Sequence, residues 1–217
     1  MDTTVPRETA LAVRRAVLKW VARRIANALF RVEVEGRENF PQSGPLLVVS
    51  NHFHWSEPPL VALSTPWDIE FLGARAAMSI KGIGWIIRLY RTIPVEKMGL
   101  NADAIRRALD FLRLGKIVGV FPEGRTHVDH LSQPWPGAAF LALRSGAPLL
   151  PVGVEGGFEA PTYWHSRRRA PIQIRIGETF GPLHSPGANG KEALQWGTRE
   201  IMSRIAALLP ERMRGAF

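Results

Sequence analysis

A histidine and a glutamate five positions apart are the first side chains in the sequence whose types and spacing suggest catalysis. His52 and Glu57 lie in residues 50–59, directly after the apolar run 44–50 that is typical of a buried strand. On one helix they would point about 140° apart, but Pro58 favours extended backbone at Glu57 and allows the loop to bring its carboxylate to His52. A carboxylate on one imidazole nitrogen leaves the other nitrogen free as a general base. The alternative is a loop histidine bonded to backbone, with Glu57 at a helix start.

A second segment, residues 118–127, runs from a strand into a turn and carries Glu123 and Arg125. A turn with exposed backbone N–H groups beside a guanidinium favours an anion, since arginine holds a phosphate through two parallel hydrogen bonds. Glu123 would then steady Arg125 or bind a hydroxyl group. A surface turn with a local ion pair is the alternative that these residues leave open.

A third segment, residues 84–97, ends at Lys97 after another short strand-like run. The ammonium group of Lys97 would bring a second cation to the anion held by Arg125. A solvated lysine after an edge strand fits the same spacing, so the residue types alone leave both interpretations open.

The elements that must position these segments alternate between strand and helix character. Short apolar runs separated by helical stretches predict an α/β fold. No internal repeat, low-complexity tract or linker divides the chain, so we expect one domain over residues 1–217 with an α/β core in residues 31–217. The expected strands are residues 31–36, 44–50, 68–72, 92–95, 117–121, 149–154 and 172–176, and the expected helices are 101–114, 137–145 and 191–209.

Residues 8–30 have helical periodicity of their own, within an N-terminal segment of residues 1–30. Arg15, Lys19 and Arg23 fall on one side of this helix and an apolar stripe falls on the other. Such a basic amphipathic helix is typical of a segment at an anionic lipid interface, and also of a helix packed on its own domain with a solvated basic face. The apolar stripe consists of Val17, Leu18, Val21, Ile25, Ala28 and Leu29.

The composition narrows the function classes. The chain has 217 residues, of which 46% are hydrophobic and 22% charged, and this excludes a disordered tail protein. Its formal net charge of +9 favours anionic partners. The absence of cysteine excludes disulfides, thiolate zinc sites and a cysteine nucleophile. No stretch of about 18 apolar residues is free of charge, so no membrane-spanning helix is expected.

Four short motifs occur in an order that is more specific than any one of them. Residues 51–57, 93–97, 121–125 and 150–153 resemble the four blocks of the 1-acylglycerol-3-phosphate (lysophosphatidate) acyltransferase family, and the resemblance covers about residues 32–157. It implies a glycerol-3-phosphate acyltransferase-like mixed sheet flanked by helices. It also implies peripheral or monotopic attachment to the cytoplasmic side of a membrane, with an anionic membrane surface as a partner.

The resemblance further implies an activity in phospholipid synthesis. Such an enzyme moves a fatty acyl group from acyl-CoA or acyl carrier protein to a hydroxyl of a lysophospholipid or glycerol phosphate acceptor, without a cofactor or metal. His52 matches the family's catalytic base, and Glu57 matches the acid that orients it. The acceptor-binding positions of the family correspond to Lys97, Glu123, Gly124 and Arg125.

This sequence departs from the family pattern at three of these positions. Glu57 stands where the family usually has aspartate, and the extra methylene moves the carboxylate by roughly 1.5 Å. Arg125 precedes Thr126, whereas the family usually has a small residue and then arginine. Lys97 replaces an arginine and gives a point charge in place of a planar fork. Together these changes indicate an acceptor somewhat different from plain lysophosphatidate.

Two other function classes are left open by the residues. A metal-dependent hydrolase is suggested because His52, His54, His127 and His130 lie beside the two candidate loops, although no His-Glu-x-x-His occurs. An inactive, lipid-binding protein of the same fold is the other class. The chain has no Gly-x-Ser-x-Gly of a serine esterase and no nucleic-acid motif beside its basic run 167–169, so no nucleic acid is expected as a partner.

Overall fold

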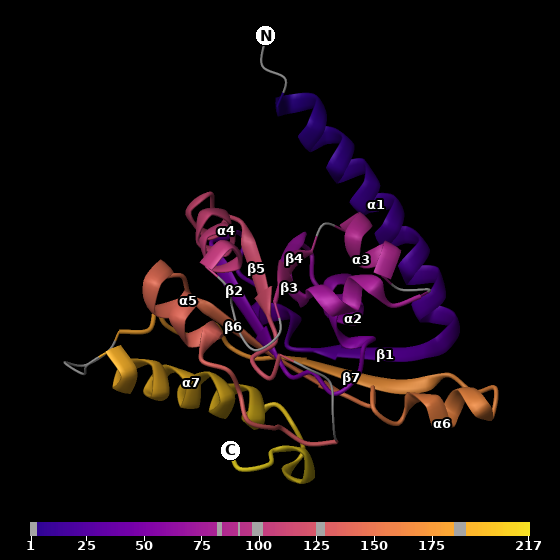
Figure 1. Cartoon of the computed structure of the whole chain (residues 1–217). Coiled ribbons are helices and arrows are strands. Elements are labelled where there is room, and N and C mark those ends of the chain that lie inside the picture. The colour runs from indigo at the N-terminus through magenta and orange to yellow at the C-terminus, as the bar shows by residue number, and fades with distance from the viewer. Residues whose placement is uncertain (1–3, 82–83, 91, 97–101, 125–128, 185–189) are drawn as a thin grey trace.

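A computed structural model describes the backbone of residues 4–81, 84–90, 92–96, 102–124, 129–184 and 190–217, and side chains from residue 13 onward. Within these ranges seven strands alternate with seven helices (Figure 1), and each strand end lies within two residues of the predicted one. The strands are β1 (Phe30–Glu35), β2 (Leu46–Ser50), β3 (Ile69–Ala74), β4 (Ile93–Val95), β5 (Ile117–Val120), β6 (Leu149–Glu155) and β7 (Ala170–Ile176). The helices are α1 (Thr4–Leu29), α2 (Glu57–Ser64), α3 (Gly84–Tyr90), α4 (Ala102–Arg113), α5 (Gly137–Ser145), α6 (Ala160–His165) and α7 (Gly190–Ala207).

The described strands form one mixed sheet in the order β1-β7-β6-β2-β5-β3-β4, as the predicted fold class requires. Neighbouring strands are parallel except β6 and β7, which run antiparallel. β2 lies between β6 and β5, with Val49 opposite Pro151 on one side and Val120 on the other. Because these three strands run in the same direction, their carboxyl ends meet at one edge of the sheet, where α/β proteins place ligand-binding loops.

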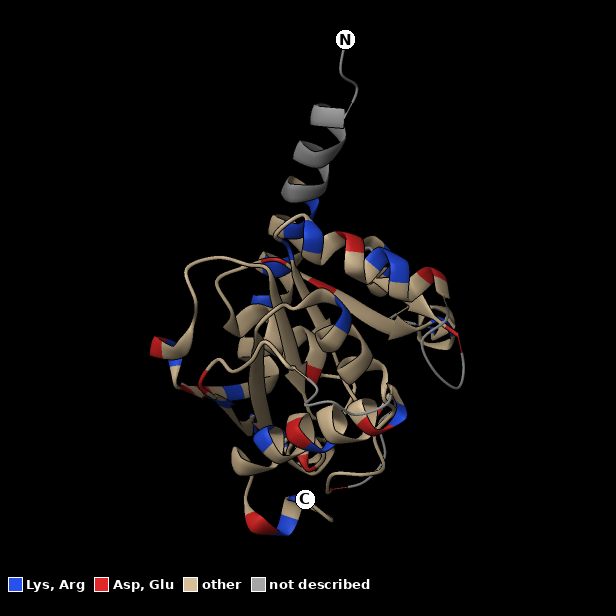
Figure 2. Ribbon diagram, turned by 90° about the vertical axis from the view of Figure 1, so that its left-hand side faces the viewer, with Lys and Arg blue, Asp and Glu red and all other residues tan. Residues whose placement is uncertain are grey.

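Strand β2 separates two hydrophobic layers and is buried along its whole length. Leu47 and Val49 pack with residues of α4, α5 and α7, whereas Leu46 and Val48 pack with residues of α1 and α2. Successive side chains of a strand point to opposite faces, which explains this division. In Figure 1, α4, α5 and α7 accordingly lie on one side of the sheet and α1, α2 and α3 on the other. Figure 2 shows that the strands at the centre carry few charged residues.

Helix α1 turns its basic side toward the body of the protein. The guanidinium group of Arg15 is buried and donates two hydrogen bonds to the carboxylate of Glu70 on β3, at 2.8 and 2.6 Å. Lys19 pairs with Asp68 at 2.7 Å, and only Arg23 of the three predicted basic residues is exposed. The expectation that this basic side faces solvent or lipid is therefore wrong. The physical reason is that a carboxylate buried at Glu70 needs a charged partner, which α1 supplies.

The apolar side of α1 is exposed instead. Trp20 and Ile25 keep 60% and 52% of their accessible surface, and Val13, Val17 and Val21 are exposed as well. Figure 1 shows α1 running past α2 and α3, with its N-terminal end extending beyond the rest of the molecule. No helix in the described part of the chain has both the length and the apolar character needed to span a bilayer. The helix thus carries an uncovered apolar stripe along its outer side.

Candidate active site

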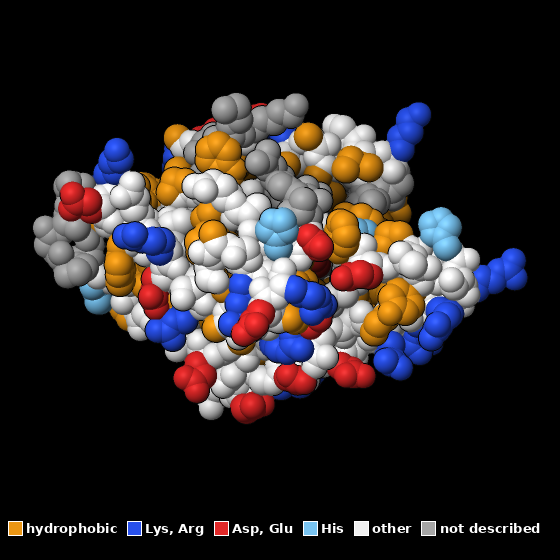
Figure 3. Space-filling view, turned by 90° about the horizontal axis from the view of Figure 1, so that it is seen from below, with side chains coloured by type: hydrophobic (Ala, Val, Ile, Leu, Met, Phe, Trp, Pro, Cys, Tyr) orange, Lys and Arg blue, Asp and Glu red, His pale blue; other side chains and the backbone are white. Residues whose placement is uncertain are grey.

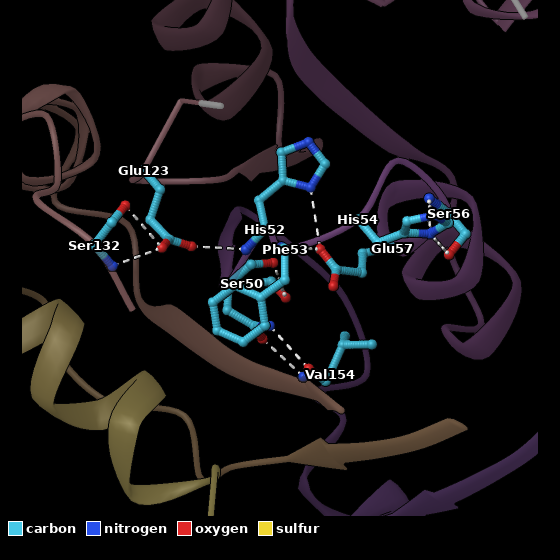
Figure 4. Close-up of polar contacts among 10 residues, drawn as sticks. Ser50, His52, Phe53, His54, Ser56, Glu57, Glu123, Ser132 and Val154 are labelled. Carbon is cyan, nitrogen blue, oxygen red and sulfur yellow. Dashed lines mark hydrogen bonds and ion pairs between the residues drawn. The ribbon is translucent and has the colours of Figure 1, made fainter. Parts of the chain in front are cut away.

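Loops that follow three neighbouring strands meet at one edge of the sheet. Residues 51–56 follow β2, residues 121–124 follow β5, and residues 156–159 follow β6. Figure 4 shows Glu123 and Glu57 on opposite sides of His52. The carboxyl ends of the parallel strands therefore bring together residues that the sequence places 71 positions apart.

The carboxylate of Glu57 contacts the imidazole of His52. Its Oε2 lies 3.1 Å from Nδ1 of His52 and accepts a hydrogen bond from the backbone N–H of Phe53 at 2.6 Å. A turn in which the N–H of Glu57 donates to the carbonyl of His54 leads into α2, whose first residue is Glu57. Two prolines follow it, and proline suits the first turn of a helix because no N–H partner is lost there. The structure thus brings the carboxylate of Glu57 to the imidazole of His52, and the catalytic roles of the two residues stay a prediction.

Asn51 fixes the start of this loop against β6. Its Nδ2 donates to the carbonyl of Val154 at 2.8 Å, and its Oδ1 accepts from the N–H of Val154 at 2.7 Å. The side-chain amide thus pairs with β6 as the backbone of a neighbouring strand would. Since Asn51 is fully buried and directly precedes His52, these bonds set the position of the imidazole relative to β6.

Glu123 supports the other side of the His52 loop. Its Oε2 accepts a hydrogen bond from the backbone N–H of His52 at 2.8 Å. Its Oε1 accepts from the N–H and the hydroxyl of Ser132 at 2.9 and 3.2 Å. Both carboxylate oxygens therefore bind groups of the protein, one of which is a hydroxyl group. The predicted contact of Glu123 with Arg125 falls outside the described residues. Sequence reasoning missed Ser132 because no motif links it to Glu123.

The two predicted phosphate-binding cations, Lys97 and Arg125, lie outside the described residues. Their phosphate binding therefore stays a prediction. Gly124, also predicted at this site, is described and has a φ of 67°, in the left-handed region that favours glycine. A Cβ atom at Gly124 would lie 3.0 Å from the ring of Trp135, so the turn also lacks room for a side chain.

Burial makes the imidazole of His52 hard to protonate. Its side chain is only 18% exposed, and its ring packs against Phe121 with centroids 4.7 Å apart. Burial lowers the pKa of His52 to about 4, although the negative charge of Glu123 opposes this shift. The ring is therefore neutral near pH 7. A neutral ring that donates its Nδ1–H to Glu57 keeps a lone pair on Nε2, which can accept a proton.

Glu57 is completely buried. Burial raises the pKa of Glu57 well above its usual value, and the charge of Glu159 acts in the same direction. Backbone hydrogen bonding from His54 and Phe53 opposes both effects by favouring the carboxylate. Oε1 of Glu57 has no hydrogen-bond partner in the described part of the chain. The acid is thus held through Oε2 alone.

The predicted metal-ligand histidines have other partners where they are described. Nδ1 of His54 lies 2.8 Å from the hydroxyl of Ser56, and Nδ1 of His130 lies 3.1 Å from Asp129. His127 is outside the described residues. Among the side chains that the structure places, no group of three or more His, Cys, Asp or Glu could hold a metal ion. At His52, Nδ1 contacts Glu57, and Nε2 can accept a proton from a hydroxyl group.

Known proteins are similar to this chain in sequence and in fold. The 1-acyl-sn-glycerol-3-phosphate acyltransferase of Bacillus subtilis is 26% identical over 179 residues, which cover 82% of this chain and 87% of that protein. The lyso-ornithine lipid O-acyltransferase of Pseudomonas aeruginosa is 26% identical over 153 residues, or 69% of this chain and 57% of that protein. The crystal structure of the 1-acyl-sn-glycerophosphate acyltransferase of Thermotoga maritima has the same fold, with a TM-score of 0.69 and 23% identity over 97% of this chain and 84% of that chain.

A family model supports the same assignment. The model described as Acyltransferase matches residues 31–155, which is more than half of the chain. The matched region includes β2, β5 and β6 and contains His52, Glu57 and Glu123. The family expected from the four sequence motifs is confirmed, and the chain belongs to the acyltransferase family.

Proposed function

We propose that this protein transfers a fatty acyl group from a thioester donor to the hydroxyl of a lysophosphatidate-like glycerol phosphate acceptor in phospholipid synthesis. The observation that carries the proposal is the neutral imidazole of His52, bound through Nδ1 to a buried acid at the carboxyl edge of the sheet. The names of the related proteins support the same reaction class.

The reaction follows from the orientation of the imidazole. Nε2 of His52 accepts the proton of the acceptor hydroxyl while that oxygen attacks the carbonyl carbon of the donor thioester. The bond between carbon and sulfur then breaks, and the departing thiolate takes the proton back from His52. Glu57 keeps the Nδ1–H in place and stabilises the imidazolium that forms between the two steps. The chain has no cysteine, so no protein thiol carries the acyl group, and direct transfer is the simplest sequence of steps.

The acceptor phosphate is assigned to Lys97 and Arg125. Both positions follow strands whose carboxyl ends lie at the edge that carries His52, since β4 ends at Val95 and β5 at Val120. Cations at that edge would bind the phosphate and orient the hydroxyl toward His52. Glu123 contributes to the same site by holding the His52 backbone.

A second acceptor class, the lyso-ornithine lipids, is favoured by a specific observation. Lys97 and Arg125 both depart from the usual phosphate-binding pattern, and a relative acts on a lyso-ornithine lipid according to its name. Lysophosphatidate and lyso-ornithine lipid therefore belong in the same acceptor panel.

Membrane association through α1 is part of the proposal. Trp20 and Ile25 belong to an exposed apolar stripe, and the exposed Arg24 lies over the ring of Trp20 at 5.3 Å. Apolar side chains that enter a bilayer beside arginines that stay at the headgroups are typical of interfacial helices. The face seen in Figure 3 instead carries basic and acidic side chains beside one another. The placement proposed is peripheral or monotopic, on the cytoplasmic side of the membrane.

The test uses the purified full chain with labelled acyl-CoA or acyl carrier protein and a panel of acceptors, followed by mass spectrometry of the products. Acyl transfer to a lysophosphatidate-like acceptor, lost in His52→Ala and unchanged by EDTA, would support the proposal. Release of free fatty acid alone, abolished by the chelator, would instead support the metal-dependent hydrolase. Binding of lipid without transfer to any acceptor would support the inactive protein of this fold.

A further inference from the structure

The buried acid of the active site lies against a residue that has no side chain. A Cβ atom built on Gly157 would lie 3.0 Å from Oε1 of Glu57 and 3.6 Å from its Cγ. It would also lie 3.2 Å from Cβ of His54. Gly157 is buried, and its φ is not in the left-handed region, so the backbone at this position does not itself require glycine. What glycine provides here is space beside the Glu57 carboxylate.

That space matters because Glu57 cannot move freely. Its Oε2 is fixed by the N–H of Phe53 at 2.6 Å and by Nδ1 of His52 at 3.1 Å, while Oε1 faces Gly157 without a hydrogen-bond partner among the described residues. A contact at 3.0 Å between a methyl carbon and Oε1 requires the carboxylate to shift by a few tenths of an ångström. Since a carboxylate is planar and rigid, Oε2 moves when Oε1 moves, and the bond to His52 is lengthened or misdirected.

The length of the acidic side chain decides whether the contact occurs. An aspartate at position 57 has one methylene fewer, so its carboxylate ends roughly 1.5 Å nearer to the backbone of α2. Resting on the proposed acyl transfer, we propose that Gly157 is a positioning residue that allows glutamate, in place of aspartate, to serve as the acid paired with His52. Positions 57 and 157 then form one steric unit. Glutamate at position 57 requires glycine at position 157, whereas aspartate at position 57 does not.

The experiment is a double-mutant cycle in the full chain, with Gly157→Ala, Glu57→Asp and the double variant. In the Glu57 background, Gly157→Ala is expected to lower kcat by about tenfold or more with a smaller effect on KM, since misplacing a catalytic group by a fraction of an ångström is costly. In the Glu57→Asp background the same change is expected to alter kcat by less than about twofold. Gly190→Ala is the matched control, because a Cβ there meets nothing within 4 Å.

A second readout does not depend on turnover. Nitrogen NMR of His52 reports whether the proton resides on Nδ1, and Gly157→Ala is expected to weaken the Nδ1–H signature with Glu57 but not with Asp at that position. If the wild-type chain acylates no acceptor, the proposed function fails while the NMR arm still tests the steric unit. Equal effects of Gly157→Ala in both backgrounds would overturn the proposal, because contact with His54 or with the fold would then explain them. No effect in either background, or loss of folding in both, would overturn it as well.

Discussion

The backbone N–H of His52 donates a 2.8 Å hydrogen bond to the carboxylate of Glu123, which lies 71 positions further along the chain. The same carboxylate holds Ser132 through its other oxygen. Glu123 thus connects the loop after β2 with the loop after β5 beneath the proposed base. Its contacts predict an effect on the placement of His52 and on stability, in addition to any effect on acceptor binding.

Replacement of Glu123 tests this connection. Glu123→Ala leaves the N–H groups of His52 and Ser132, which are half-buried, without an acceptor. A fully buried group left unpaired costs about 1–3 kcal/mol, which is the upper limit for each of them. We expect a lower unfolding midpoint in urea and a kcat reduced by about tenfold or more. Ser132→Ala is the control, because it removes only the 3.2 Å bond from the hydroxyl. A raised acceptor KM with unchanged kcat and stability would contradict this prediction and favour direct substrate binding.

The pairing of His52 with Glu57 predicts a graded series of activities. His52→Ala is expected to abolish acyl transfer, because a general base contributes about 10²–10⁴-fold. Glu57→Asp is expected to keep activity, since a carboxylate remains, whereas Glu57→Gln is expected to lose most of it because an amide does not stabilise the imidazolium. Initial rates with one acceptor and one donor check the series. Full activity of His52→Ala would end the proposed mechanism.

The pH dependence of kcat/KM should depend on Glu159. The active form needs a neutral His52 and an ionised Glu57. His52 is neutral above its pKa of about 4, whereas burial raises the pKa of Glu57, so ionisation of Glu57 sets the acidic limb. Removing the negative charge in Glu159→Gln lowers the pKa of Glu57, and the limb should move to lower pH.

The matched control for that shift is Glu178→Gln. Glu178 is exposed and follows β7, whose carboxyl end lies at the opposite edge of the sheet because β7 is antiparallel to β6. A pH profile that moves equally in both variants would reflect a general charge effect. A limb that stays in place in Glu159→Gln would contradict the assignment to Glu57.

The pairing at the active site could be predicted from local signals. A continuous apolar run predicts the buried β2, and the proline after Glu57 indicates the turn that returns its carboxylate to His52. The partners of Glu123 could not be predicted, because the hydrogen bonds to His52 and Ser132 depend on how β2 and β5 align in the sheet. The short helices α3 and α6 were not predicted, since fewer than eight residues show too little periodicity.

The orientation of α1 depends on a partner that periodicity does not reveal. The pattern separated a basic from an apolar side correctly, but the usual rule that the apolar side faces inward fails here. A signal was present in β3, where Glu70 interrupts a strand buried on both faces and therefore needs a cation nearby. Arg15 meets that need, and its position fixes the orientation of the helix.

Loss of the buried ion pair should be costly. Arg15→Ala leaves Glu70 buried without its charged partner, and breaking such a pair from one side costs about 3–5 kcal/mol. The free energy of unfolding from urea titrations is the measurement. Arg14→Ala, at an exposed position on the same helix, is expected to change it by less than about 0.5 kcal/mol. Equal stability of the two variants would show that α1 is not held by the pair.

The exposed side of α1 predicts where the protein meets a membrane. Trp20→Glu and Ile25→Glu each place a charge in the apolar stripe and remove about 1.5–3 kcal/mol of transfer free energy, so binding to anionic vesicles should weaken by tenfold or more. Point substitutions are preferable to deletion of residues 1–30, because deletion also removes Arg15 from Glu70. Leu114→Glu, at a 71% exposed position after α4, is the control in the co-sedimentation assay. If both α1 variants bind vesicles as the wild type does, or if the control loses binding equally, α1 does not bind the membrane and only packs against the protein.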